Sequence, residues 1–264
     1  MRSPPRTLRR SCPVTGSPGS KESGALSRSR GGPHRHRLWE AWAVSGRPHT
    51  FLFADLAGFT ALTEAHGDEQ AVALVGEFGA AVRRLLADHR AQEVKSIGDA
   101  VMIRGDEPAA AIRLGLKIVH EVGEQHGFPV VRVAMHTGSA LERHGDWFGA
   151  TVNLAARVSG AASGGEVLLT DATRAAAGGL EGVELRERGR TTLKNVGEPM
   201  LLYAAVQAGE RDPEDGLPID PVCRMAVDPE HSAGRLTHAD VEYHFCSLEC
   251  AARFAAAPDD YTEG

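Results

Sequence analysis

The sequence is poor in several features that would indicate particular classes of protein. It has no run of 18 or more apolar residues, and its start does not combine positive charge with an apolar core. We therefore expect neither a membrane-spanning helix nor a signal peptide. Only four residues are cysteines, and three of these, Cys223, Cys246 and Cys250, lie near the C-terminus while Cys12 lies near the start. An odd group of three argues against a disulfide framework and favours a protein of the reducing cytoplasm.

Aromatic residues are also scarce, at 5% of the chain, and none precedes Trp39. Residues 1–47 are instead rich in Arg, Ser, Pro and Gly and show no apolar periodicity before Leu38, which predicts a disordered tail. The positive charge of this tail is compatible with a nucleic acid or a membrane surface. Because nucleic-acid binding usually combines charge with aromatic side chains, we expect a solvated tail and no nucleic-acid partner.

The rest of the composition is typical of a globular protein, with 42% hydrophobic residues, 24% charged residues and a net charge of −6. The length of 264 residues allows one or two domains. A polar stretch at residues 209–217 predicts a linker between a domain at 48–208 and a small module at 218–264. The larger segment is long enough to bury a hydrophobic core.

Apolar patterning in residues 48–208 predicts alternating strands and helices. A buried strand runs into Asp55, and residues 92–103 indicate a β-hairpin with Gly98-Asp99 at its turn. The other predicted elements are helices at 69–89, 108–125 and 151–159, strands at 130–136 and 166–170, and a final pair of short strands within 191–206. The order β-α-β-β-α-β is that of an α+β, ferredoxin-like fold, in which helices cover one face of a mostly antiparallel sheet.

Two carboxylates fall where such a fold brings strands together. Asp55 ends the first strand and Asp99 lies in the hairpin turn, and these elements are neighbours in a ferredoxin-like sheet. A pair of oxygen ligands suits Mg²⁺ or Mn²⁺, with phosphates completing the shell. Gly58, Phe59 and Thr60 then open a helix whose free N–H groups would face a polyphosphate. Taken singly, Asp55 would be interpreted as a helix cap and Asp99 as a turn residue, because Asp is common in both places.

Three sequence blocks together resemble the signature of class III nucleotidyl cyclases. They are Phe-Ala-Asp-Leu-Ala-Gly-Phe-Thr at 53–60, Lys-Ser-Ile-Gly-Asp-Ala at 95–100 and Gly-Asp-Trp-Phe-Gly-Ala-Thr-Val-Asn-Leu-Ala-Ala-Arg at 145–157. Three blocks in one order are far more specific than a single short motif. The resemblance covers about residues 49–207 and implies active sites that lie between the two protomers of a homodimer.

The resemblance assigns roles by position. It implies that Asp55 and Asp99 hold two divalent ions, with the carbonyl of Leu56 as a further ligand. It implies that Lys95 and Asp146 read the purine. The metal ligands would come from one protomer and the purine-reading residues from the other, so a monomer would be inactive.

The same resemblance assigns Asn153 to orienting the ribose and Arg157 to stabilising the transition state, both from the protomer that reads the purine. The two residues are four apart and so project from one helix face. Lys194 is a candidate for contacting the phosphates and is equally compatible with a solvated surface lysine. The loop between Gly138 and Asp146 is shorter than in many relatives, which would weaken the dimer.

The pair of purine-reading residues predicts the base. Lys95 only donates hydrogen bonds and ionised Asp146 only accepts them, which matches the N1 acceptor and the amino donor of adenine and opposes both groups of guanine. We therefore expect an adenylate cyclase that converts ATP to cyclic AMP and pyrophosphate. The alternatives are a catalytically silent nucleotide- or metal-sensing dimerisation module and a guanylate cyclase.

The C-terminal module resembles a YHS domain. The resemblance is carried by Asp-Pro-Val-Cys-Arg-Met at 220–225 and Tyr-His-Phe-Cys-Ser-Leu-Glu-Cys at 243–250. Cys223, Cys246 and Cys250 would suit Zn²⁺ or Cu⁺, with His244 or a carboxylate as a possible fourth ligand. Buried free cysteines in a small core are the alternative. A module this short usually needs a metal or a partner in order to fold.

Overall fold

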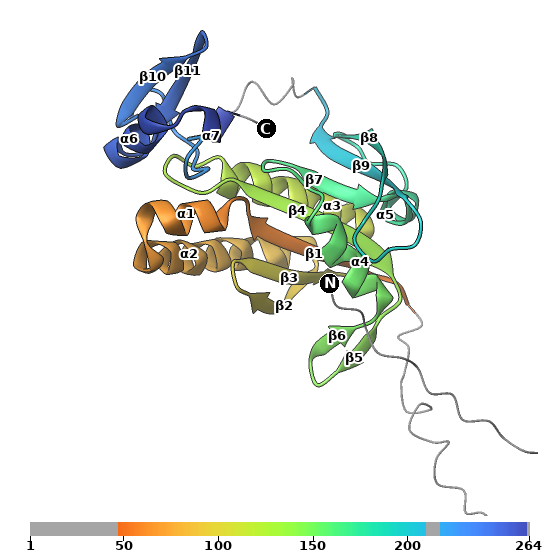
Figure 1. Cartoon of the computed structure of the whole chain (residues 1–264). Coiled ribbons are helices and arrows are strands. Elements are labelled where there is room, and N and C mark those ends of the chain that lie inside the picture. The colour runs from red at the N-terminus through yellow and green to blue at the C-terminus, as the bar shows by residue number, and fades with distance from the viewer. Residues whose placement is uncertain (1–46, 210–216, 263–264) are drawn as a thin grey trace, which may run out of the picture. The chain divides into compact units, whose positions relative to one another are not determined.

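A seven-stranded sheet forms the centre of the larger domain in the computed structural model (Figure 1), which describes residues 47–209 and 217–262. The predicted tail (1–47) and linker (209–217) lie, apart from their bordering residues, outside these ranges. The strands of the sheet are β1 (His49–Leu56), β2 (Ala91–Ile97), β3 (Ala100–Gly105), β4 (Val131–Gly138), β7 (Val167–Thr170), β8 (Val183–Thr191) and β9 (Met200–Gln207).

The strand order confirms the predicted ferredoxin-like arrangement. The sheet runs β2-β3-β1-β4-β7-β9-β8, and the part formed by the first four strands is antiparallel throughout. Strand β7 joins β4 in parallel and extends the sheet beyond that unit. The predicted hairpin is β2 and β3, which are joined by the two-residue turn Gly98-Asp99. Gly98 has a φ of 62°, which matches the glycine at the first position of a type II′ turn.

Helices cover both faces of the sheet, so the prediction that they cover one face was wrong. In chain order they are α1 (Phe59–His66), α2 (Asp68–Leu86) with the 3₁₀ turn η1 (Ala87–His89), α3 (Pro108–Lys117) with the π-helical turn η2 (Ile118–Val122), α4 (Ala150–Ser159) and α5 (Asp171–Ala177). Every residue of β1 is buried, because Leu52 packs toward α2 and α3 while Phe51 and Phe53 pack toward α4. Among the described residues, no helix is long and apolar enough to cross a membrane.

The prediction for the end of the domain was wrong. The final strand pair was expected within residues 191–206, but β8 spans Val183–Thr191 and residues 192–199 form the loop to β9. Strand β8 lies at the edge of the sheet, pairs only with β9 and carries alternating Glu and Arg residues. Such a half-exposed edge strand shows little of the apolar alternation that identifies a strand from sequence.

The C-terminal module is a hairpin followed by two helices. Strands β10 (Gly234–His238) and β11 (Val241–Phe245) pair antiparallel, and α6 (Leu248–Ala256) and α7 (Asp259–Thr262) follow. Phe254 of α6 packs against Phe245, with ring centroids 5.2 Å apart.

The module is attached to the larger domain through backbone hydrogen bonds to the loop before β4. The amide of Gly127 donates to the carbonyl of Ala226 over 2.9 Å, and the amide of Ala226 donates to Phe128 over 2.9 Å. Phe245 and Phe254 also belong to the same apolar cluster as the residues of α2 and α3. These contacts join the module to the segment that leads into the central strand β4.

Candidate functional site

Two carboxylates meet at one end of the sheet. Asp55, near the end of β1, is the cross-strand partner of Ala100, and Asp99 directly precedes Ala100 in the hairpin turn. Burial, the negative charge of Asp55 and a hydrogen bond between the two carboxyl groups raise the pKa of Asp99 to about 6. Two acids that repel each other in a half-buried site are suited to sharing divalent cations. Leu56 has a hydrocarbon side chain and is 1% exposed, so a further ligand from this residue would have to be its backbone carbonyl.

Arg132 on β4 balances this negative charge. It is the cross-strand partner of Asp55, and its Nε and Nη2 donate to Oδ2 of Asp55 over 2.8 and 2.5 Å. The guanidinium charge also acts on Asp99, where it opposes the rise in pKa. Arg132 therefore orients the Asp55 carboxylate through two charge-assisted hydrogen bonds.

Lys95 and Asp146 form an ion pair on the face of the sheet that also carries Asp55. The Nζ of Lys95 lies 2.7 Å from Oδ2 of Asp146, and this contact lowers the pKa of the Asp146 carboxyl. The backbone amide of Trp147 donates to the other oxygen of Asp146 over 2.8 Å. Lys95 pairs with Met102 across β2 and β3, and Met102 pairs with Phe53 of β1, two residues before Asp55.

A short ribbon presents Asp146. It consists of β5 (Leu141–Arg143) and β6 (Asp146–Phe148), which pair with each other and with no other strand of the described chain. Trp147 is 6% exposed and anchors the ribbon, because its ring packs against Phe51 with ring centroids 5.5 Å apart. Asp146 is held on one side of β6 while Trp147 points into the domain.

The loop after β1 leads into α1 through a left-handed residue. Gly58, the N-cap of α1, has φ 77° and ψ 26°, and among the described residues no side chain caps this helix. Gly58 and Thr60 are exposed and Phe59 is half-buried. The first N–H groups of α1 thus lie directly after the Asp55 carboxylate, where a polyphosphate would meet both.

Asn153 and Arg157 lie on the exposed face of α4, as their four-residue spacing predicted. Within the described part of the chain, neither side chain forms a hydrogen bond or an ion pair with Asp55 or Lys95. Lys194 is exposed in the loop from β8 to β9. That loop packs on α4, because Leu193 and Val158 share one apolar cluster. Within one chain, Asp55 therefore lies beside Asp99 and Lys95 beside Asp146. Asn153 and Arg157 face outward from α4.

The family of the chain follows from a comparison with family models. The model for the adenylate and guanylate cyclase catalytic domain matches residues 47–206, which is more than half of the chain. The chain belongs to this family. The match spans the sheet, its helices and every predicted site residue outside the C-terminal module.

Relatives and solved structures agree with the assignment to the cyclase family. The chain is 42% identical over 132 residues to a pH-sensitive adenylate cyclase of Mycobacterium tuberculosis, covering 50% of this chain and 33% of that protein. It is 36% identical over 129 residues to an adenylate cyclase of Streptomyces griseus, covering 49% and 32%. This cyclase-family chain therefore matches only about a third of the length of these curated relatives. A structure of adenylate cyclases from Trypanosoma brucei in their monomeric state superposes with a TM-score of 0.57 at 25% identity, covering 63% of this chain and 91% of that one.

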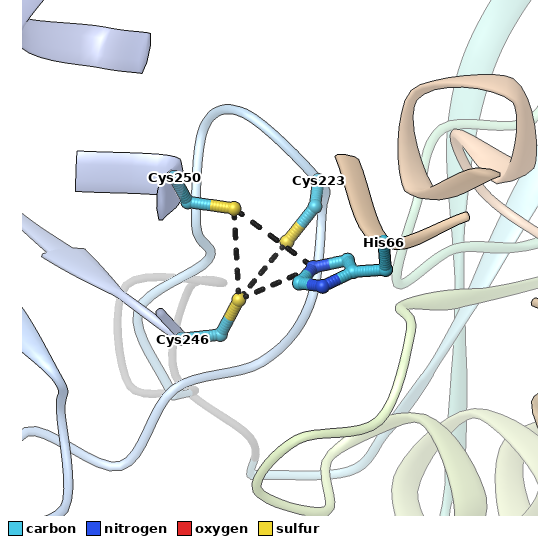
Figure 2. A group of neighbouring side chains, drawn as sticks. All are labelled: His66, Cys223, Cys246 and Cys250. Carbon is cyan, nitrogen blue, oxygen red and sulfur yellow. Dashed lines mark hydrogen bonds between the residues drawn. The ribbon is translucent and has the colours of Figure 1, made fainter. Parts of the chain in front are cut away.

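A second cluster of ionisable groups lies outside the region matched by the cyclase family model, except for one member (Figure 2). Ligand atoms of His66, Cys223, Cys246 and Cys250 all lie within 4.8 Å of one another. The structure thus brings the three predicted cysteines together. His244 is not part of the group, because its Nε2 lies 3.2 Å from Oε1 of Glu242. The nitrogen at the fourth position belongs instead to His66, the last residue of α1.

Three residues that organise these sites were not predicted from the sequence. Arg132 interrupts an apolar strand, and its charge was the available signal of a partner on β1. Asp220, which is fully buried, lies three residues before Cys223 and was read only as part of the resemblance to a YHS domain. His66 carried no signal, because it is more than 150 positions from each of the cysteines it meets.

Proposed function

We propose that this chain is an adenylate cyclase that converts ATP to 3′,5′-cyclic AMP and pyrophosphate. The ion pair between Lys95 and Asp146 supports this most strongly, because a member of the cyclase family carries it on the same sheet face as Asp55. Adenine offers an acceptor at N1 and a donor at its amino group, and Lys95 and Asp146 complement both. Guanine opposes both residues, and each unpaired buried group would cost about 1–3 kcal/mol.

The carboxylate pair fits divalent cations. Asp55 and Asp99 would hold Mg²⁺ or Mn²⁺, with the carbonyl of Leu56 as a further oxygen ligand. The raised pKa of Asp99 supports this assignment, because it reflects two carboxyl groups held close together. Arg132 contacts Asp55 and supplies one positive charge for the two acids. When bound, the ions would lower the pKa of the ribose 3′-hydroxyl and neutralise charge on the phosphoryl oxygens.

The remaining residues would bind and orient the nucleotide. The amides of α1 from Phe59 onward would donate to the β- and γ-phosphates. Asn153 would hold the ribose so that its 3′-oxygen points at the α-phosphorus. Arg157 would place a fixed cation beside the phosphoryl oxygens, a contribution on the order of 10³-fold or more in related phosphoryl transfers. Lys194 would reach the phosphates from the loop that packs on α4.

The active unit would be a homodimer. The outward-facing Asn153 and Arg157 have no partner in the Asp55–Asp99 pair of their own chain, so a second copy would bring the two halves together. Each dimer would then have two composite sites related by a two-fold axis. We place the activity in the cytoplasm, where ATP is available and thiols such as Cys250 stay reduced.

The main alternative is a catalytically silent module that keeps the fold for dimerisation or sensing. All of the residues that the reaction requires are present, namely Asp55, Asp99, Asn153 and Arg157, which favours activity. A guanylate cyclase is the second alternative, and the Lys95–Asp146 pair opposes it.

The test is cyclic AMP formation by the purified full chain with Mn²⁺ and ATP or GTP. We expect ATP turnover that falls by about 10³-fold or more in Asp99→Ala. Ser96→Ala is the matched control, because Ser96 lies in the same hairpin, is exposed and donates a hydrogen bond from its hydroxyl to Glu93. Absence of cyclic AMP at every protein concentration would support the silent module, and equal use of ATP and GTP would contradict the proposed base selection.

A further inference from the structure

The donor atoms of the thiol cluster lie at spacings compatible with a four-coordinate metal site (Figure 2). The Sγ of Cys246 lies 3.3 Å from that of Cys223 and 3.8 Å from that of Cys250. The Nε2 of His66 lies 3.5 Å from the sulfur of Cys246 and 3.8 Å from that of Cys250. A zinc ion with Zn–S bonds of about 2.3 Å and a Zn–N bond of about 2.0–2.1 Å has S···S edges of about 3.8 Å and S···N edges of about 3.6 Å.

We propose that these four residues form a Cys₃His zinc site in which the catalytic domain supplies the histidine. Three thiolates and one imidazole are a typical donor set of closed, structural Zn²⁺ sites. The site spans two parts of the chain, because Cys223, Cys246 and Cys250 belong to the C-terminal module while His66 ends α1 of the cyclase domain.

Hydrogen bonds to Asp220 hold the backbone around two of the cysteines. The carboxylate of fully buried Asp220 accepts hydrogen bonds from the amides of Val222 and Cys246, each over 2.9 Å. One acidic side chain thereby fixes the two loops that carry Cys223 and Cys246. Residues that position metal ligands in this way commonly contribute about 10–100-fold to metal affinity.

Cys250 is placed where a thiolate is stabilised. It lies in the first turn of α6, and its amide donates to the hydroxyl of the N-cap residue Ser247 over 3.1 Å. The N-terminus of a helix favours negative charge.

A disulfide does not account for the cluster. The shortest sulfur–sulfur distance, 3.3 Å, is well beyond the length of about 2.05 Å that a disulfide requires. Burial of three thiols in a core gives no reason for an imidazole nitrogen to point at two of them. A shared cation satisfies all four groups at once.

The zinc site would also constrain the nucleotide site, an extension that rests on the proposed function. Helix α1 has eight residues and is about 12 Å long, with His66 at one end and Gly58 at the other. Arg224, next to Cys223, packs its aliphatic stem on Gly58, since a Cβ there would lie only 2.6 Å from Cγ of Arg224. Zinc would thus hold both ends of α1 against the module, including the loop proposed to bind the triphosphate.

The first experiment measures zinc alone, on the reduced full chain, by metal analysis and competition with a chromogenic chelator. We expect one tightly held Zn²⁺ per chain, and a loss of affinity of about 100-fold or more in Cys250→Ala and in His66→Ala. His244→Gln is the matched control and should keep wild-type affinity, since the Nε2 of His244 contacts Glu242. Circular dichroism of each variant checks that it folds.

Cobalt substitution identifies the ligands directly. The wild-type chain should show thiolate-to-cobalt charge transfer and the strong d–d bands of tetrahedral Co²⁺. In His66→Ala the d–d bands should shift while charge transfer remains, and added imidazole should restore both the wild-type bands and the zinc affinity. Zinc affinity unchanged in His66→Ala but lost in His244→Gln would overturn the proposal, as would the absence of stoichiometric zinc or a preference for Cu⁺ that is independent of His66.

The second experiment tests the link to α1 by hydrogen exchange with and without zinc. We expect the amides of residues 59–66 to exchange faster when zinc is removed or when Cys250 is replaced by Ala. This readout does not depend on catalysis, so an inactive enzyme with zinc-protected α1 would contradict the proposed function alone. Zinc binding that leaves α1 exchange unchanged would contradict the link alone.

Discussion

The two clusters of ionisable side chains differ in how much of each site one chain supplies. In the thiol cluster, four donor atoms from four segments converge within 4.8 Å. In the carboxylate cluster, Asp55 and Asp99 of one chain lie together, while Arg157 lies on the exposed face of α4. A metal site closed by protein ligands holds structure, whereas an open one leaves positions for a substrate. Under the two proposals, the same chain would combine a closed site that positions α1 with an open one that a second copy would complete.

The largest effect should come from the open site, where protomers must complement each other. Asp55→Ala and Arg157→Ala should each lower cyclic AMP formation by about 10³-fold or more. An equal mixture should recover about a quarter of wild-type activity, because about half of randomly formed dimers are mixed and each mixed dimer has one intact site of two. The measurement is turnover after mixing and re-equilibration of the two variants.

Two Asp55→Ala batches mixed in the same way are the control and should stay inactive. A mixture of the two different variants that also stays inactive, although dimers form, would place all catalytic residues of a site in one chain and remove the contrast between the clusters.

The next largest effect should come from removing the metal of the closed site. Zinc held at a thousand times its dissociation constant contributes about 4 kcal/mol to folding, so its removal from the wild-type chain should lower the melting temperature by about 8–16 °C. In Cys223→Ala the same chelator should change little. Withdrawing Mg²⁺ or Mn²⁺ from the wild type should leave the melting temperature nearly unchanged, since the open site is completed only with substrate. Differential scanning calorimetry distinguishes the two cases.

A smaller effect is expected on base selection. Lys95→Met keeps the length of the side chain and removes its donor groups, so one buried contact to adenine is lost at a cost of about 1–3 kcal/mol. The ratio of kcat/KM for ATP to that for GTP should fall by about 10–100-fold. Lys117→Met is the control, because Lys117 is exposed on α3 and pairs with Glu121. An unchanged ratio in Lys95→Met would show that another residue reads the base.

The smallest effect should be a gain in stability from Asp99→Asn. The pKa of Asp99 is raised from 3.8 to about 6, so the folded chain binds this proton more tightly than the unfolded chain does. Its stabilising contribution is therefore complete below about pH 4 and lost as the pH rises through about 6. Without Mg²⁺ or Mn²⁺ at pH 8, Asp99→Asn should be more stable by about 1 kcal/mol after allowance for solvent screening, or about 2–4 °C.

The gain should shrink at pH 5, and Asp88→Asn, at an exposed carboxylate on η1, should show no such pH dependence. A destabilised Asp99→Asn at pH 8 would mean that Asp99 is held mainly by favourable contacts rather than strained against Asp55.

The fold was predictable where local chemistry determines it. The hairpin of β2 and β3 follows from Gly98-Asp99 between two runs of β-forming residues, and the long helix α2 follows from its apolar periodicity. The neighbouring positions of Asp55 and Asp99 then follow from the strand order. Strand β8 was placed too late because only Val183 and Leu185 are apolar in an edge strand that is otherwise rich in charged residues.

Site residues were predictable from the sequence only where they share one helix or strand, or one of the sequence blocks that resemble a known family. Asn153 and Arg157 share a helix, so their common face follows from spacing. His66 meets Cys246 only because the module packs on α1, a contact over 180 residues of sequence that periodicity does not encode. His244 was predicted, with a carboxylate as the alternative, as a possible fourth ligand, but it lies outside the thiol cluster and its Nε2 contacts Glu242.

The position of Trp147 has a practical consequence. The chain contains three tryptophans, and Trp39 and Trp42 both precede residue 47, where the described structure begins. A shortened chain that starts at residue 47 would keep one indole, adjacent in sequence to the carboxylate that contacts Lys95. Its fluorescence would then report arrival of the base at the ribbon, with no dye or modified nucleotide required.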